Sequence, residues 1–262
     1  MSETGEDYIV EMEDITKRFG EVVALDGVTL RLRRGEVLAL AGDNGAGKST
    51  LIKCLAGALQ PDGGTIRING EAVEIDSPRR AKELGIETTF QDLAIAGNLT
   101  VTQNIFLGRE EVAGTGGLLG VLNKGAMRER AQELLDELNI GVDVEEKVSN
   151  LSGGERQLVS ISRTMLSDPE IIIMDEPTSA LSVEGAERVL ELIDRMQSQG
   201  ISIILISHNL DYIRRAADRI HVLHQGTDAG VIDGETATQD DIVKRMVAGM
   251  PDGDQGGQPA DG

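Results

Sequence analysis

The spacing of apolar and polar positions changes along the chain and predicts both strands and helices. From residue 8 to 34 apolar and polar side chains alternate, which is typical of half-buried antiparallel strands. Short apolar runs within 36–41, 171–174 and 201–207 instead predict strands that are buried on both faces, as in a parallel sheet. Between about 92 and 165 the apolar residues recur at helical spacing. The pattern therefore predicts an α/β fold with a mainly parallel sheet, an antiparallel β part and an inserted helical part.

Two dipeptides in the alternating stretch, Phe19-Gly20 and Asp26-Gly27, are turn signals. Phe19 is one of only three Phe residues, and its flat ring beside a Gly turn offers a face on which an adenine can stack. The alternative is a core side chain that closes the turn.

Residues 42–49 read Gly-Asp-Asn-Gly-Ala-Gly-Lys-Ser and match the phosphate-binding template G-x-x-x-x-G-K-[ST]. A predicted strand precedes this loop and an apolar helical pattern at 50–56 follows it, which is the context that the motif requires. Backbone N–H groups of such a loop point at phosphate oxygens, the Lys48 ammonium reaches the β- and γ-phosphates and the Ser49 hydroxyl is a ligand for Mg²⁺. The predicted nucleotide-binding residues are Phe19, Gly42, Asp43, Asn44, Gly45, Ala46, Gly47, Lys48, Ser49 and Thr50.

Polar side chains also follow the other predicted parallel strands. Asp175 and Glu176 end an apolar run, and two carboxylates there are costly unless something binds to them. Asp175 is placed to hold Mg²⁺, and Glu176 to polarise the water that attacks the γ-phosphate. His208 ends the 201–207 strand and is a candidate hydrogen-bond donor to the γ-phosphate, or else a structural hydrogen-bonding residue. Gln91 ends the strand at 86–90 and can reach a metal ion and a water, although an exposed loop Gln is the common case.

A second glycine motif opens a helix at residues 151–155, Leu-Ser-Gly-Gly-Glu. Ser152 is the predicted N-cap, and paired glycines at a helix start accept a close anion. Residues 151–155 are therefore either a second phosphate site or a simple capped helix start.

Composition narrows the function further. The 262 residues carry a net charge of −20, and only seven of the 25 basic residues are Lys. Such a surface disfavours nucleic acid, and it resembles proteins of salt-loving organisms, in which salt screens the self-repulsion. No apolar run approaches the roughly 20 residues of a membrane span, and the N-terminus lacks the pattern of a signal peptide, so we expect a cytoplasmic protein. The segment 251–262 has no apolar residue except Ala260 and is expected to be a disordered acidic tail.

Taken together in order and spacing, these motifs resemble the ATP-binding subunit of ABC transporters over about residues 8–248. The resemblance implies a P-loop ATPase domain at 1–250, with a helical subdomain at about 92–165 inserted in a RecA-like core, and ATP and Mg²⁺ as cofactors. It implies that two copies pack head to tail, with ATP between the 42–49 loop of one copy and the signature Leu151, Ser152, Gly153, Gly154 and Glu155 of the other. Phe19 then matches the aromatic residue that stacks adenine, and Gln91 the residue that couples the metal to the membrane partner. Glu176 matches the general base, His208 the γ-phosphate switch, and Ser49, Gln91 and Asp175 the metal site.

Three stretches, 85–94, 104–110 and 207–210, are similar to the branch of the family that powers monosaccharide uptake. That similarity implies a homodimer on the cytoplasmic face of the membrane, a separate permease and, indirectly, an extracellular sugar-binding protein. The acidic, Lys-poor composition separately suggests a halophilic archaeon as the source. Ser182 departs from the family pattern, in which many members have Asp, so whether both sites fire equally stays open. The alternatives are a soluble ABC ATPase of DNA repair or translation, and an exporter ATPase. The sequence does not name the sugar.

Overall fold

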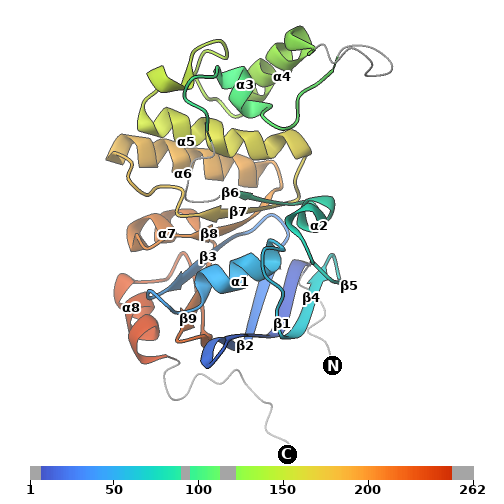
Figure 1. Cartoon of the computed structure of the whole chain (residues 1–262). Helices are drawn as coiled ribbons and strands as arrows, with labels where there is room; N and C mark the ends of the chain where they lie inside the picture. Colours follow the sequence, from blue (N-terminus) through green and yellow to red (C-terminus); the bar gives the residue numbers. More distant parts are fainter. Residues whose placement is uncertain (1–6, 90–94, 113–121, 250–262) are drawn as a thin grey trace, which may run out of the picture. The chain divides into compact units, whose positions relative to one another are not determined.

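The computed structural model of the chain describes residues 7–89, 95–112 and 122–249 and divides into two compact units (Figure 1). One unit combines the residues up to Leu84 with those from Ser202 onwards. The other comprises Gly85–Ile201. Among the described residues, no helix is long and apolar enough to span a membrane.

The first unit contains an antiparallel sheet in the order β2-β1-β4-β5. Its strands are β1 (Tyr8–Phe19), β2 (Val22–Arg33), β4 (Gly63–Ile68) and β5 (Glu71–Val73). Val10 pairs with Leu32 and Met12 with Leu30, and all four side chains are buried. The alternation in the sequence therefore predicts the buried face of this sheet correctly.

The predicted turn at Asp26-Gly27 is wrong, because β2 continues through it. Ile15 pairs with Val28, whereas Lys17 pairs with Leu25, so the register shifts beside this dipeptide. Gly27 has a φ of +70°, and the shift marks a bulge in the strand. A glycine in the left-handed region suits a bulge as well as a turn, and the dipeptide does not distinguish the two.

The first unit also contains parallel strands on which the glycine loop is mounted. The strand β3 (Val37–Gly42) pairs in parallel with both β8 (Ser202–Ile206) and β9 (Arg219–His224). Strand β10 (Thr227–Asp233) pairs with β9 in the antiparallel sense. Every residue of β3 is buried, as expected for a strand with neighbours on both sides. The helices of this unit are α1 (Lys48–Leu55), α2 (Pro78–Glu83), α7 (Leu210–Ala216) and α8 (Gln239–Ala248).

The second unit combines two parallel strands with the helical part of the chain. Its strands are β6 (Ile86–Thr89) and β7 (Ile171–Asp175). Its helices are α3 (Val101–Ile105), α4 (Lys124–Glu137), α5 (Gly153–Ser162) and α6 (Val183–Ser198), with the 3-10 turns η1 (Val148–Asn150) and η2 (Arg163–Ser167). Helices α5 and α6 lie side by side in Figure 1 and touch at two glycines, since a Cβ on Gly154 would lie 3.0 Å from the Cα of Gly185. The predicted subdomain limits, 92–165, stay a prediction, and the predicted tail 251–262 lies outside the described residues.

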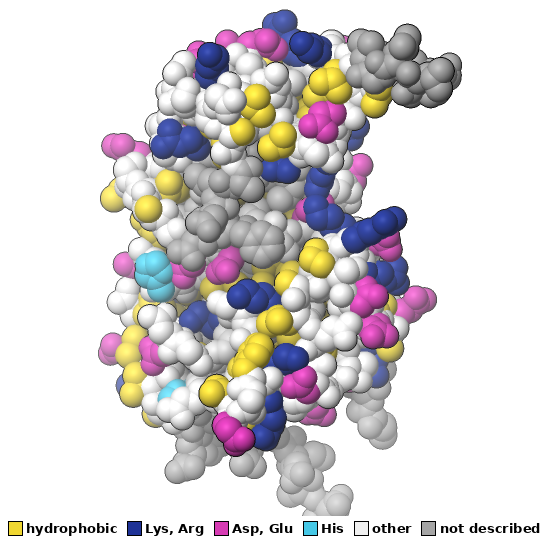
Figure 2. All heavy atoms as spheres, viewed as in Figure 1, with side chains coloured by type: hydrophobic (Ala, Val, Ile, Leu, Met, Phe, Trp, Pro, Cys, Tyr) yellow, Lys and Arg dark blue, Asp and Glu magenta, His cyan; other side chains and the backbone are white. Residues whose placement is uncertain are grey.

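Charged side chains of both signs share the surface of the molecule. On the face shown in Figure 2, Asp and Glu side chains lie among Lys and Arg side chains. Exposed ion pairs such as Arg79 with Glu83, 3.1 Å apart, are of the kind that adds little to stability.

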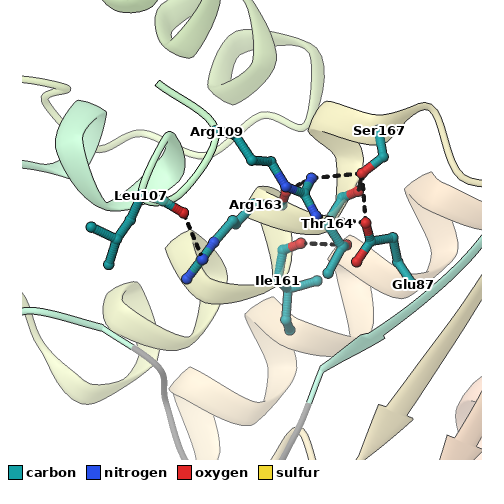
Figure 3. A network of polar contacts seen from close by, with 7 residues as sticks. All are labelled: Glu87, Leu107, Arg109, Ile161, Arg163, Thr164 and Ser167. Carbon is teal, nitrogen blue, oxygen red and sulfur yellow. Dashed lines mark hydrogen bonds and ion pairs between the residues drawn. The ribbon is translucent and has the colours of Figure 1, made fainter. Parts of the chain in front are cut away.

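A polar network inside the second unit is of a different kind, because its carboxylate is buried (Figure 3). Glu87 of β6 is 4% exposed and accepts hydrogen bonds from Arg109 at 2.6 Å and from the Ser167 hydroxyl at 2.7 Å. Arg163 donates to the Leu107 carbonyl at 2.8 Å, and burial lowers its pKa. The network ties β6, the strand that leads to Gln91, to η2 and to the segment after α3.

Arg109→Ala tests whether this buried pair stabilises the fold. Removing the guanidinium takes the counter-charge from a buried carboxylate, so we expect the free energy of unfolding to fall by about 3 kcal/mol in urea titrations. Arg79→Ala, at the exposed pair with Glu83, is the matched control and should cost about 0.5 kcal/mol or less. Equal losses for the two variants would contradict a special contribution of the network.

Candidate functional site

The glycine loop forms one wall of a hollow in the first unit. The hollow has a volume of about 360 Å³. Its lining consists of Phe19, Val22, Val23 and Ala24 on one side and of the loop and helix residues Asp43, Asn44, Gly45, Ala46, Gly47, Lys48, Ser49 and Thr50 on the other. The structure thus brings Phe19 together with the loop, as the sequence predicts.

Glycines allow this loop positive φ angles and a close backbone contact that a residue with a side chain would not adopt. Gly45 and Gly47 have φ values of +86° and +103°. Gly42, with a φ of +152°, has no room for a side chain, because a Cβ there would lie 2.6 Å from the carbonyl oxygen of Leu223. The loop can therefore turn sharply while staying packed against β9.

The loop ends at a helix start that no side chain neutralises. Gly47 is the N-cap of α1, no side chain caps this helix, and its first turn contains no acidic residue. The N–H groups and the positive end of the helix dipole therefore face the hollow without a carboxylate from the helix itself. This arrangement attracts an anion, and phosphate oxygens are the ligands that suit it.

Lys48 adds a positive charge over the same loop. Its ammonium donates to the carbonyl oxygens of Gly42 at 2.6 Å and Asp43 at 3.0 Å. These contacts hold the Nζ atom over the loop, close to the N-terminus of α1. An anion on the loop would be within reach of this ammonium.

The exposure of Phe19 decides between the two roles considered for it. Phe19 is 48% exposed, so it is not the core side chain of the alternative interpretation. The Lys17 ammonium lies 5.8 Å from the ring centroid. Val22 and Val23, which line the same hollow as the ring, were not predicted as site residues. The turn signal at Phe19-Gly20 contained that information, because a tight hairpin places Val22 opposite Phe19.

His208 follows β8 and is exposed. Because β3 and β8 are parallel neighbours, with Leu40 opposite Ile206, their carboxyl ends lie at the same sheet edge. His208 and the glycine loop therefore extend from one edge of this sheet. The neighbouring Asn209 caps α7 through hydrogen bonds to the N–H groups of Asp211 and Tyr212.

The carboxylates Asp175 and Glu176 lie in the second unit, at the end of β7. The strand residues Ile171–Met174 are fully buried, and exposure begins at Asp175. Glu176 has a φ of +53°, which is uncommon for a residue with a side chain and costs about 1 kcal/mol or more. Backbone strain of this kind concentrates at functional positions. Gln91 lies outside the described residues.

The signature motif forms its own pocket in the second unit, of about 400 Å³. The pocket is lined by Ser152, Gly153, Gly154 and Glu155 and by Ala180, Leu181, Ser182, Glu184, Gly185 and Arg188. The predicted cap is confirmed, since the Ser152 hydroxyl accepts from the N–H of Glu155. The Glu155 carboxylate accepts in return from the Ser152 N–H at 2.8 Å and from its hydroxyl at 2.7 Å. These hydrogen bonds hold the pKa of Glu155 below its usual value.

Arg188 is the cation of this pocket that the sequence analysis missed. Its guanidinium lies 3.9 Å from the Glu155 carboxylate. It is placed on α6, one helix turn beyond the 182–185 segment, and no local motif marks it. Only the contact between α5 and α6 brings it to the signature.

Comparison with known proteins identifies a family. A family model described as ABC transporter matches residues 25–179. The chain is 47% identical to the xylose/arabinose import ATP-binding protein XylG of Sulfolobus acidocaldarius, covering 83% of this chain and 85% of that protein. It is 41% identical to the fructose import ATP-binding protein FrcA of Rhizobium meliloti, covering 91% of this chain and 93% of that protein. It is 42% identical to the ribose import ATP-binding protein RbsA 1 of Rubrobacter xylanophilus, of which it spans 47%.

Solved structures show the same fold. MJ1267, an ATP-binding cassette of an ABC transporter, superimposes with a TM-score of 0.80 at 29% identity, covering 94% of this chain and 98% of that one. A dimeric post-hydrolysis state of the cassette MJ0796 bound to ADP and Pi gives a TM-score of 0.70 at 26% identity, covering 87% of this chain and all of that one. The predicted α/β fold of ABC type is confirmed. The chain therefore belongs to the ABC transporter family.

Proposed function

We propose that this chain is the ATP-binding and ATP-hydrolysing subunit of an ABC importer that energises the uptake of a sugar. The observation that carries the proposal is near full-length similarity, at 41–47% identity, to the import ATP-binding proteins for xylose/arabinose and fructose. The chain spans about half the length of the ribose import relative, so the activity of the whole importer is part of the proposal. The names of the relatives favour a monosaccharide without selecting one.

The hollow beside the glycine loop supports the binding of ATP. The exposed Phe19 ring offers a face on which adenine would stack, and Val22 and Val23 line the same hollow. The triphosphate lies on the backbone N–H groups of Gly42–Thr50, and Lys48 contacts its β- and γ-phosphates. The uncapped start of α1 supports this placement, because a bound anion accepts hydrogen bonds from the first N–H groups of the helix.

Hard oxygen donors suit Mg²⁺, which keeps several waters and takes few protein ligands. The Ser49 hydroxyl and the Asp175 carboxylate are such donors, and the Gln91 amide oxygen is a third. A Mg²⁺ ion held by these donors would neutralise negative charge on the triphosphate.

Hydrolysis needs a group that orients and deprotonates the attacking water, and we assign this role to Glu176. Glu176 directly follows a buried strand and has a strained backbone, and both features fix the point from which its side chain extends. His208, exposed at the sheet edge that carries the loop, donates a hydrogen bond to the γ-phosphate and loses that acceptor when the phosphate leaves.

The signature residues Leu151–Glu155 complete the site of a second copy of the chain. Two copies in head-to-tail arrangement place the capped start of α5 against the γ-phosphate bound by the other copy. The dimeric MJ0796 cassette, bound to ADP and Pi, supports dimerisation of this chain. ATP then holds the dimer closed, and loss of a phosphate opens it.

The remaining partners follow from the importer class. We place the subunit on the cytoplasmic face of the membrane, against a permease that forms the path of the sugar. An extracellular sugar-binding protein delivers the substrate to that permease.

Glu176→Gln tests the catalytic assignment. The amide keeps the size of the side chain but cannot take a proton, so we expect ATP hydrolysis to fall by at least about 100-fold. ATP binding, measured by calorimetry, should stay within a few-fold of wild type. Lys48→Ala is the contrasting variant, and loss of its charge-assisted contact should weaken ATP binding itself by about 10-fold or more. Unchanged turnover of Glu176→Gln would show that another group is the base.

Affinity purification of the tagged chain from mildly solubilised native membranes tests the importer assignment. The expected result is co-purification of a multi-span permease whose recovery depends on the tagged chain. Recovery with ribosomes or nucleic acid and without a permease would overturn the importer assignment while leaving the ATPase assignment intact.

A further inference from the structure

Gly226, in the turn between β9 and β10, contacts both sides of the hollow beside the glycine loop. Its N–H donates to the carbonyl oxygen of Ala46 in the glycine loop at 3.0 Å. Its own carbonyl accepts from the N–H of Asp26, in β2, at 2.8 Å. β2 carries Val22, Val23 and Ala24 of the opposite wall. The N–H and C=O groups of Gly226 therefore connect the glycine loop, on one side of the hollow, with β2, on the other side.

The hydrogen bond to Ala46 also sets the direction of the next N–H group. A trans peptide is planar, and its C=O and N–H point in opposite directions. Holding the Ala46 carbonyl towards the turn therefore aims the Gly47 N–H away from it. Gly47 is the N-cap of α1, where phosphate oxygens are expected to bind.

Close backbone contact makes this position specific for glycine. Gly226 has a φ of +82°, and a Cβ on it would lie 2.9 Å from the carbonyl oxygen of Ala24. A Cβ on Gly47 would lie 2.7 Å from the same oxygen and 3.6 Å from the Cα of Gly226. The backbones of Ala24, Gly47 and Gly226 are thus in direct contact, and any bulk at Gly226 must push the two walls apart.

The turn itself is anchored by two side chains. The Thr227 hydroxyl donates to the carbonyl of His224 at 2.8 Å and closes the turn. The Nδ1 atom of His224 lies 2.6 Å from the Met246 carbonyl of α8, to which it donates. These two hydrogen bonds hold the turn in place and so fix the position from which the Gly226 N–H donates to Ala46.

We propose that Gly226 is a positioning residue for ATP: through the Ala46 carbonyl it orients the Gly47 N–H towards the phosphates and sets the width of the hollow. This inference rests on the proposed binding of ATP by the 42–50 segment. According to this inference, part of the ATP affinity depends on the turn between β9 and β10, which lies outside the loop motif.

Gly226→Ala, compared with Gly70→Ala, tests the proposal. Gly70 has a φ of +78° and nothing within 4 Å of a Cβ, so its variant carries the same backbone strain without the contact. ATP affinity is measured by calorimetry at a temperature at which both variants are folded by circular dichroism. We expect Gly226→Ala to weaken ATP binding by about 10- to 100-fold, the cost of one misplaced charge-assisted hydrogen bond, and Gly70→Ala to bind as wild type does.

Steady-state kinetics separates positioning from general damage. The KM for ATP should rise in Gly226→Ala while kcat stays within a few-fold, because Glu176 is untouched. A folded Gly226→Ala that binds ATP like wild type would overturn this inference alone. A wild-type chain that does not bind ATP would overturn the proposed function and this inference with it.

Thr227→Val decides the matter if Gly226→Ala does not fold. It removes the hydroxyl that closes the turn without adding bulk, and ATP binding should weaken by about 2- to 10-fold. Thr236→Val is its control, because within the described part of the chain that exposed hydroxyl bonds to Asp233 of its own turn. Equal ATP affinities for the two Thr variants and wild type would overturn the proposal.

Discussion

The uncapped start of α1 is the physical feature on which the proposed ATP site depends most, because its backbone N–H groups have no side-chain partner from the helix. The chain carries a net charge of −20, so the overall field of the protein repels ATP. In the proposed site, attraction comes from local groups: the glycine loop, the uncapped start of α1 and the Lys48 ammonium. Fixed dipoles of this kind act over a few ångströms and are effective despite the acidic surface, particularly where salt screens the longer-range repulsion.

The parts of the chain that surround the loop serve to hold it. β3 is buried along its whole length between β8 and β9, which fixes the point from which the loop begins. Gly42 packs on the Leu223 carbonyl, and Gly226 donates to the Ala46 carbonyl, so the loop is supported at its start and near its middle. The second unit shows the contrasting arrangement, because the start of α5 already has its own carboxylate in Glu155. A phosphate that approaches Ser152 from another copy must therefore compete with Glu155, whereas one that approaches Gly47 meets no such competitor on α1.

The sequence predicted those features whose chemistry is contained in a few adjacent residues. The 42–49 motif, the Ser152 cap and the buried strand before Asp175 were predicted from residue type and spacing, and the structure places them as expected.

Features that depend on distant contacts were not predicted. The hydrogen bond from the Gly226 N–H to the Ala46 carbonyl, for example, joins positions 180 residues apart in the chain. Asp26-Gly27 was misinterpreted because the same backbone conformation serves a turn and a bulge. Arg188 reaches the signature only through helix packing. The roles of Gln91, Asp175, Glu176 and His208 stay predictions.

The central claim is that one ATP site is assembled from two copies of the chain. A mixing experiment with two variants, each damaged in a different half of the site, tests it most directly. Lys48→Ala damages the loop half, and Ser152→Asp damages the signature half, because Asp still caps a helix but places a negative charge against the γ-phosphate. Each variant alone should hydrolyse ATP very slowly. The account predicts that mixing them restores hydrolysis, since a mixed dimer contains one undamaged loop facing one undamaged signature. A mixture no more active than the sum of its components would contradict it.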